Sequence, residues 1–121
     1  MSDITSQTLT SLVKNIKEKK LSSEEVTKAF VDRSEKSREL NAYITEDFSN
    51  AIDKAKKFDE KPNLDLKLPG IPMAVKDLFC TKDIRTTAGS KILENFVPTY
   101  ESTVTENIWN EGGILLGKLN C

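Results

Sequence analysis

The chain has 121 residues, of which 37% are apolar and 31% charged, and its formal net charge is -1. This length predicts no more than one domain, or part of one, with enough apolar residues for a core. Because acidic and basic residues are mixed along the chain, the charge does not predict direct binding to nucleic acid or to an anionic membrane. The sequence contains no histidine, which excludes Ser-His-Asp and Cys-His catalysis within these residues and removes the commonest nitrogen ligand of zinc.

The two cysteines, Cys80 and Cys121, have neither a metal-type spacing nor the pattern of a disulfide framework, which favours a reducing compartment. The N-terminus lacks a basic start followed by an apolar core, so we expect no signal peptide. Apolar runs such as Ile114–Leu116 are far shorter than the ~20 residues of a membrane span. We therefore expect a cytoplasmic protein with no membrane contact and no metal.

The first half of the chain is predicted to be mainly helical. An amphipathic helix is expected over residues 5–19, from the helical spacing of Leu9, Leu12, Val13 and Ile16. Ser22 and Glu25 have the form of a capping box. They predict a second helix over residues 23–38, which would form a hairpin with the first through Val26, Ala29 and Phe30. A short strand at 42–45 and a third helix at 48–58 follow.

Strands and helices alternate in the second half. Pro72 argues against a helix, and the apolar run Met73–Val75 predicts a strand buried on both faces. Thr103, followed three residues later by a glutamate, is a second candidate capping box, and its helix would end at Gly112–Gly113. Residues 114–120 predict another buried strand. This order indicates an α/β fold in which a helical hairpin precedes alternating strands and helices of a mixed sheet.

Gly112, Gly117 and Lys118 match G-x-x-x-x-G-K, which is most of a phosphate-binding loop. The next residue is Leu119, where the motif requires a serine or threonine hydroxyl for magnesium. The intervening residues have the pattern of a buried strand. We therefore interpret the match as the end of a helix followed by a strand, and expect no nucleotide site.

Lys76 ends the apolar run in "LPGIPMAVKDLF" (residues 68–79), and two interpretations of it remain open. A lysine at a strand end can keep its ammonium in water, paired here with Asp77. Alternatively, a lysine held in a desolvated pocket has a lowered pKa, so that its neutral amine can act as a base near neutral pH. Such a base activates a hydroxyl nucleophile without histidine, provided that a serine or threonine lies within hydrogen-bond reach.

Three segments carry a resemblance to a known family: "LPGIPMAVKDLF", "TTAGSKIL" (residues 86–93) and "ESTVTENIWNEGGILLGKLN" (residues 101–120). Together they resemble the amidase signature family, and within it the glutamine-hydrolysing subunits of tRNA-dependent amidotransferases. "LSSEEVTKAF" and "NAYIT" are similar to the start of such subunits, so the resemblance covers nearly all of the chain. It implies the amidase signature fold, with residues 1–121 as the N-terminal portion of the domain.

By this resemblance, Lys76 is the lysine of the family's Ser-cisSer-Lys triad. It is the base that deprotonates the bridging cis-serine, which relays the proton from the serine that attacks the amide carbonyl. The implied substrate is glutamine, whose ammonia passes to a partner subunit. The implied partners are the B and C subunits of the amidotransferase. ATP and magnesium are used by the partner subunit that amidates glutamate on tRNA, so this chain is expected to hold no cofactor.

In the family, both triad serines lie in a Gly- and Ser-rich segment that follows "GKLN". The sequence stops at Cys121, so we expect a truncated N-terminal portion that is inactive alone. Two alternatives remain open. One is a non-catalytic fragment that binds a partner subunit through its N-terminal helices, and the other is a relic of a decayed gene.

Overall fold

The computed structural model describes residues 3–121, so the first two residues of the predicted domain 1–121 lie outside it. The elements follow the predicted order: α1 (Leu9–Lys17), α2 (Ser23–Lys36), β1 (Tyr43–Glu46), α3 (Phe48–Glu60), β2 (Pro72–Lys76), α4 (Thr103–Asn110) and β3 (Ile114–Leu119). The α/β fold class is confirmed. None of the helices within residues 3–121 has the length and apolar character that crossing a bilayer requires.

The three strands form one mixed sheet in the order β1-β3-β2. The central strand β3 runs antiparallel to β1 and parallel to β2, and α4 lies in the crossover between the parallel strands. Residues 114–118 of β3 are buried, as predicted. In β2 only Val75 is buried. The prediction that Met73–Val75 is buried on both faces is therefore wrong for this chain, because β2 lies at the sheet edge, where fewer neighbours cover it.

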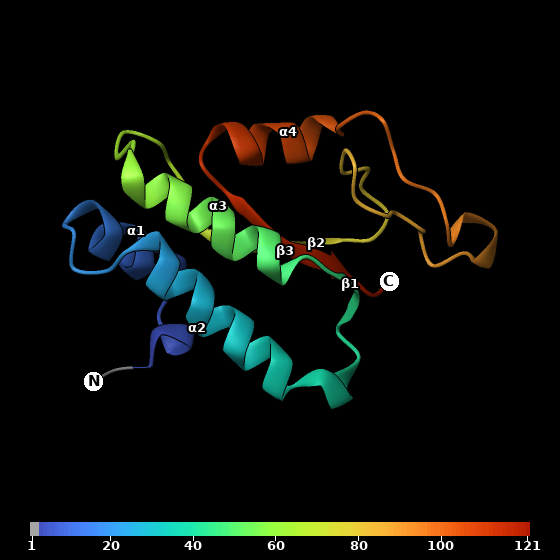
Figure 1. Ribbon diagram of the computed structural model, residues 1–121, viewed down its shortest axis with the longest axis horizontal. Coiled ribbons are helices and arrows are strands. Elements are labelled where there is room, and N and C mark those ends of the chain that lie inside the picture. Colours follow the sequence, from blue (N-terminus) through green and yellow to red (C-terminus); the bar gives the residue numbers. More distant parts are fainter. Residues whose placement is uncertain (1–2) are drawn as a thin grey trace.

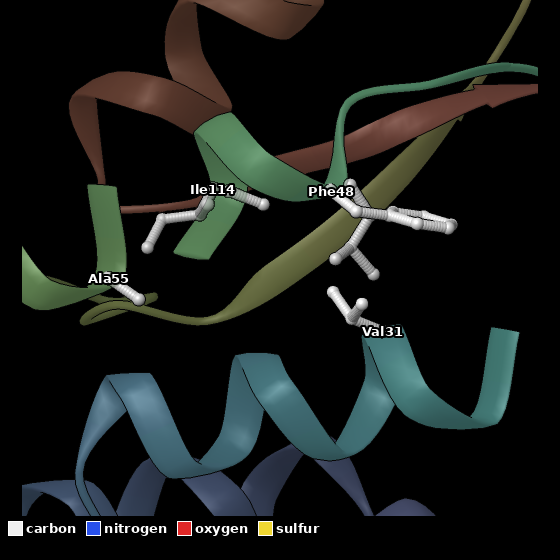
Figure 2. Close-up of a cluster of buried hydrophobic side chains, with 6 residues drawn as sticks. Val31, Phe48, Ala55 and Ile114 are labelled. Carbon is white, nitrogen blue, oxygen red and sulfur yellow. The ribbon is translucent and has the colours of Figure 1, made fainter. Parts of the chain in front are cut away.

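Helices α2 and α3 lie side by side, and each contacts the sheet, α3 at β3 and α2 at β2 (Figure 1). Between them and β3 lies a cluster of buried side chains made up of Val31, Phe48, Ala51, Ala55, Ile114 and Leu116. In Figure 2, Val31 of α2 points toward Phe48 of α3, and Ile114 of β3 lies near Ala55. The small side chains of Ala51 and Ala55 let α3 approach the strand closely.

The first helix begins at Leu9, four residues later than predicted, because Thr8 caps it. The Thr8 hydroxyl accepts a hydrogen bond from the Ser11 N–H at 3.1 Å. The predicted contact between α1 and α2 is confirmed, with Leu12, Ile16 and Val26 buried and Val13 and Phe30 packed against them. Leu9 is 49% exposed, so its predicted place in this contact is wrong.

The caps of α2 and α4 follow the same principle. The Ser22 hydroxyl accepts from the Glu25 N–H at 3.1 Å, which confirms the predicted start of α2. Helix α4 is capped one residue before the predicted position. The Ser102 hydroxyl accepts from the Thr105 N–H at 3.3 Å, because Ser102 is the extended residue at that point and Thr103 is already helical.

Contacts at the start of α2 hold the connection that leads into β2. The Ser23 hydroxyl donates to the Gly70 carbonyl at 2.6 Å. The two oxygens of Asp59 accept from the backbone N–H groups of Ser23 and Glu24, each at 2.9 Å. Gly70 has a φ of +64°, and a Cβ there would lie 2.6 Å from the Ser23 Cβ, so glycine is required. These contacts fix where the strand that carries Lys76 begins.

We expect Leu12→Ala to lower the free energy of unfolding by about 2–5 kcal/mol, because it leaves a cavity between α1 and α2. Urea denaturation measures this loss. Leu9→Ala is the matched control on the same helix, and its exposed side chain predicts a change within about 0.5 kcal/mol. Equal losses for the two variants would contradict the observed packing.

Candidate active site at the end of strand β2

Lys76 is the last residue of β2 and pairs with Leu119 of β3, which confirms its predicted place at a strand end. Its side chain is exposed, whereas Val75 and Asp77 on either side are buried. The interpretation that places the Lys76 amine in a desolvated pocket, pointing into the molecule, is therefore wrong within residues 3–121, where the alternative of an ammonium kept in water holds. The alternating exposure follows from strand geometry, since consecutive side chains point to opposite faces.

Lys118 of β3 is the buried lysine of this region, with a side chain that is 0% exposed. Its ammonium donates to three oxygens: the Phe79 carbonyl at 2.8 Å, the Thr81 hydroxyl at 3.0 Å and the Thr86 hydroxyl at 2.8 Å. These bonds use all three donors of a lysine ammonium. Lys118 thereby joins the central strand to the segment that follows Lys76.

Asp77 supplies the opposite charge. Its Oδ1 lies 3.7 Å from Lys118 Nζ, and both side chains are 0% exposed. Its Oδ2 accepts from the Thr87 N–H at 3.1 Å and from the Thr87 hydroxyl. Burial lowers the pKa of Lys118, while the Asp77 carboxylate acts in the opposite direction by stabilising the ammonium. The interpretation that Asp77 pairs with Lys76 is wrong, because Asp77 faces Lys118.

We call the five side chains of Asp77, Thr81, Thr86, Thr87 and Lys118 the buried polar cluster. Four of its members belong to the long connection from β2 to α4, and the fifth, Lys118, lies in β3; the connection extends to the right of the helices in Figure 1. All five side chains are nearly inaccessible to solvent. The cluster therefore holds the chain around Lys76, but within residues 3–121 it offers no surface on which a substrate could sit.

The sequence did not reveal the role of Lys118, which attracted attention only through the phosphate-loop pattern. Gly117 and Lys118 lie inside β3, which confirms the interpretation of that segment as a strand. The available signal was a lone charged residue in the apolar run "ILLGKL". A lysine is almost never fully buried unless it is paired, so this pattern requires an acidic partner elsewhere in the chain.

Among the described residues, no group of three or more histidine, cysteine, aspartate or glutamate side chains is placed to hold a metal ion. Cys80 is half-buried. Its thiol lies 3.5 Å from the Tyr100 hydroxyl and donates to it. The exposed side chains of this region include the amines of Lys76 and Lys82.

Residues 25–121 match the model of the family described as Amidase. The chain belongs to the amidase family. Over all of its 121 residues it is 81% identical to the A subunit of the glutamyl-tRNA(Gln) amidotransferase of Pelagibacter ubique (strain HTCC1062), of which it covers 25%. Over 122 aligned residues, 99% of the chain, it is 48% identical to the corresponding subunit of Hyphomonas neptunium (strain ATCC 15444), again covering 25% of that protein.

Solved amidase structures have the same fold. The peptide amidase of Stenotrophomonas maltophilia matches with a TM-score of 0.83 and 25% identity, over 95% of this chain and 25% of that one. A bacterial aryl acylamidase of the amidase signature family matches with a TM-score of 0.83 and 25% identity, over 94% and 25%. The amidase signature fold implied by the sequence is confirmed. The chain spans about a quarter of the length of the curated relatives that it matches.

Proposed function

We propose that this chain is the N-terminal part of the glutamine-hydrolysing subunit of a cytoplasmic glutamyl-tRNA(Gln) amidotransferase. The observation that carries the proposal is the 81% identity over the whole chain with the Pelagibacter ubique amidotransferase protein. Amidases named for other substrates, such as the peptide amidase and the aryl acylamidase, match at only 25% identity. The relation to the amidotransferase subunits therefore favours glutamine as the substrate.

In the proposed reaction, Lys76 is the general base. Its neutral amine accepts a proton from a bridging serine, which takes one from the nucleophilic serine as that oxygen attacks the side-chain amide carbon of glutamine. The carbon–nitrogen bond breaks, ammonia leaves with a proton returned through the same relay, and a glutamyl ester remains on the serine. Water then hydrolyses the ester to glutamate. In the family, both serines belong to a segment that this sequence does not contain.

Within residues 3–121 the Lys76 side chain is exposed, so a further segment has to cover the amine before it can act as a base. The side chain stands at the surface of residues 3–121, at the C-terminal end of an edge strand. A serine-bearing segment that packs over this end would bring a hydroxyl to the amine and remove water from it. Desolvation favours the neutral form of a lysine, which is the form that a base requires.

The proposed partners are the B and C subunits of the amidotransferase, which receive the ammonia. ATP and magnesium would be used by the partner subunit that activates glutamate on tRNA. This chain would contribute no cofactor site and no direct contact with nucleic acid, and its part in the complex would be to supply the base and the framework that holds it.

A chimaeric subunit tests the proposal. In it, residues 1–121 replace the matching quarter of the Pelagibacter ubique protein, and the B and C subunits are co-expressed. We expect ammonia release from glutamine at a rate comparable to that of the unmodified complex, and none from residues 1–121 alone. Release by residues 1–121 alone that is lost in Lys76→Ala would contradict the proposal, because it would require a nucleophile within these residues.

A further inference from the structure

We propose that Asp77 and Lys118 form a positioning pair that aims the Lys76 side chain at the reacting atoms. This inference rests on the proposed function of Lys76. The side chains of Asp77 and Lys118 are both 0% exposed, so neither is placed to touch a substrate. Any effect of the pair on the reaction therefore passes through the groups that it holds, and Lys76 is bonded directly to Asp77 in the chain.

The pair determines the face on which Lys76 lies. The Asp77 N–H donates to the Leu119 carbonyl at 2.9 Å, so strand pairing continues one residue beyond β2. Consecutive residues of a paired strand point to opposite faces. Because the Asp77 carboxylate is held inside by Lys118, Lys76 must point outward. A strand that slipped or turned at this position would move both side chains together.

The same contacts pin the turn that follows Lys76. The Phe79 N–H donates to the Lys76 carbonyl at 3.1 Å, and the Phe79 carbonyl accepts from Lys118 at 2.8 Å. The Ala88 N–H donates to the Asp77 carbonyl at 2.8 Å, and Thr87 donates twice to the Asp77 side chain. The backbone on the C-terminal side of Lys76 is thus held both by the central strand and by the returning loop.

A buried ion pair is suited to this task. Well-packed apolar residues often stabilise a protein as much as a buried ion pair does, so stability alone does not account for the charges. Hydrogen bonds to charged groups are directional, and here they define one orientation of the turn. That precision matters for a base, since a displacement of about 1 Å in a reacting group can lower a rate about 10²-fold.

The test is a double-mutant cycle between positions 76 and 77 in the chimaeric complex. Asp77→Ala removes the anchor, and we expect it to lower kcat for glutamine hydrolysis by about 10²-fold while KM changes by less than about twofold. In the Lys76→Ala background, the same substitution is expected to lower the residual rate by less than about twofold, because no base remains to be aimed. Asp77→Asn keeps an acceptor for the Thr87 N–H but removes the charge that faces Lys118, so we expect it to restore only part of kcat.

Equal losses of kcat in both backgrounds would overturn the positioning role and leave a structural one. A Lys76→Ala complex with the full rate would instead refute the proposed function, so the two failures are distinguishable. If Asp77→Ala does not fold, Thr87→Val takes its place in the cycle, because it removes only the hydroxyl that donates to Asp77. We expect Thr87→Val to lower kcat less than Asp77→Ala does, and to do so only when Lys76 is present. An equal effect of Thr87→Val with and without Lys76 would overturn the proposal.

Discussion

Replacing Lys76 with alanine in the chimaeric subunit is expected to lower the rate of ammonia release from glutamine by about 10²–10⁴-fold, the usual contribution of a general base. Alanine retains the strand but removes the amine that accepts the proton. Because the Lys76 side chain is exposed within residues 3–121, its loss should leave the packing of these residues nearly unchanged. A large loss of rate without a loss of stability is the signature of a catalytic group.

Lys82→Ala is the matched control for this prediction. Lys82 is also an exposed lysine and lies six residues further along the same connection. We expect its replacement to leave the rate of ammonia release unchanged. A similar loss of rate in both variants would indicate a general effect of positive charge on the complex, and an unchanged rate in Lys76→Ala would remove Lys76 from the reaction.

Lys118→Ala is expected to lower the free energy of unfolding by about 3–5 kcal/mol, because it leaves the Asp77 carboxylate buried without its ion-pair partner. It also leaves the hydroxyls of Thr81 and Thr86 without their charged donor. This is the largest effect on stability that we expect from a single change in the site. The midpoint of urea denaturation of the chimaeric subunit, compared with the unchanged chimaera, measures it.

The double variant Lys118→Met/Asp77→Leu distinguishes two causes of the lost stability, the unpaired charge of Asp77 and the lost packing of the Lys118 side chain. Removing both charges together is expected to recover much of the stability that Lys118→Ala loses, since apolar residues of similar size can replace a buried pair. The exposed Lys91 provides a control through Lys91→Ala. If Lys118→Ala shifted the midpoint no more than Lys91→Ala does, the burial of Lys118 in the structure would be contradicted.

The order of elements could be predicted because it depends on local patterns. The helical spacing of Leu12 and Ile16 and the hydroxyl of Ser22 are visible in the sequence, and the structure uses them as expected. The exact start of α1 was missed because the apolar spacing, which begins at Leu9, does not locate the cap: the predicted helix began at residue 5, whereas Thr8 caps the helix that starts at Leu9. The error over Leu9 has the same origin, since a residue in the first turn can fit the period and still face solvent.

The site was less predictable, because it depends on contacts between distant segments. The resemblance marks Lys76 as the counterpart of the family's triad lysine, but whether its side chain is covered depends on what packs over the end of β2. The buried pair of Asp77 and Lys118 links the end of β2 to the neighbouring strand β3, and the whole crossover lies between the two residues in the sequence. Asp77 does not stand out locally, because "KD" is a common pair in a chain of which 31% is charged, and the lone Lys118 in "ILLGKL" requires a partner without indicating which residue it is.

The most direct test of the central proposal is amide transfer by the chimaeric complex with two alternative nitrogen donors. We expect it to convert glutamyl-tRNA(Gln) to glutaminyl-tRNA(Gln) with either glutamine or ammonium chloride, and the Lys76→Ala complex to do so only with ammonium chloride. That result would show that residues 1–121 supply the base for glutamine hydrolysis in an otherwise working enzyme. A chimaeric complex that uses ammonium chloride but not glutamine, or that uses neither, would contradict the proposal that this chain is the N-terminal part of such a subunit.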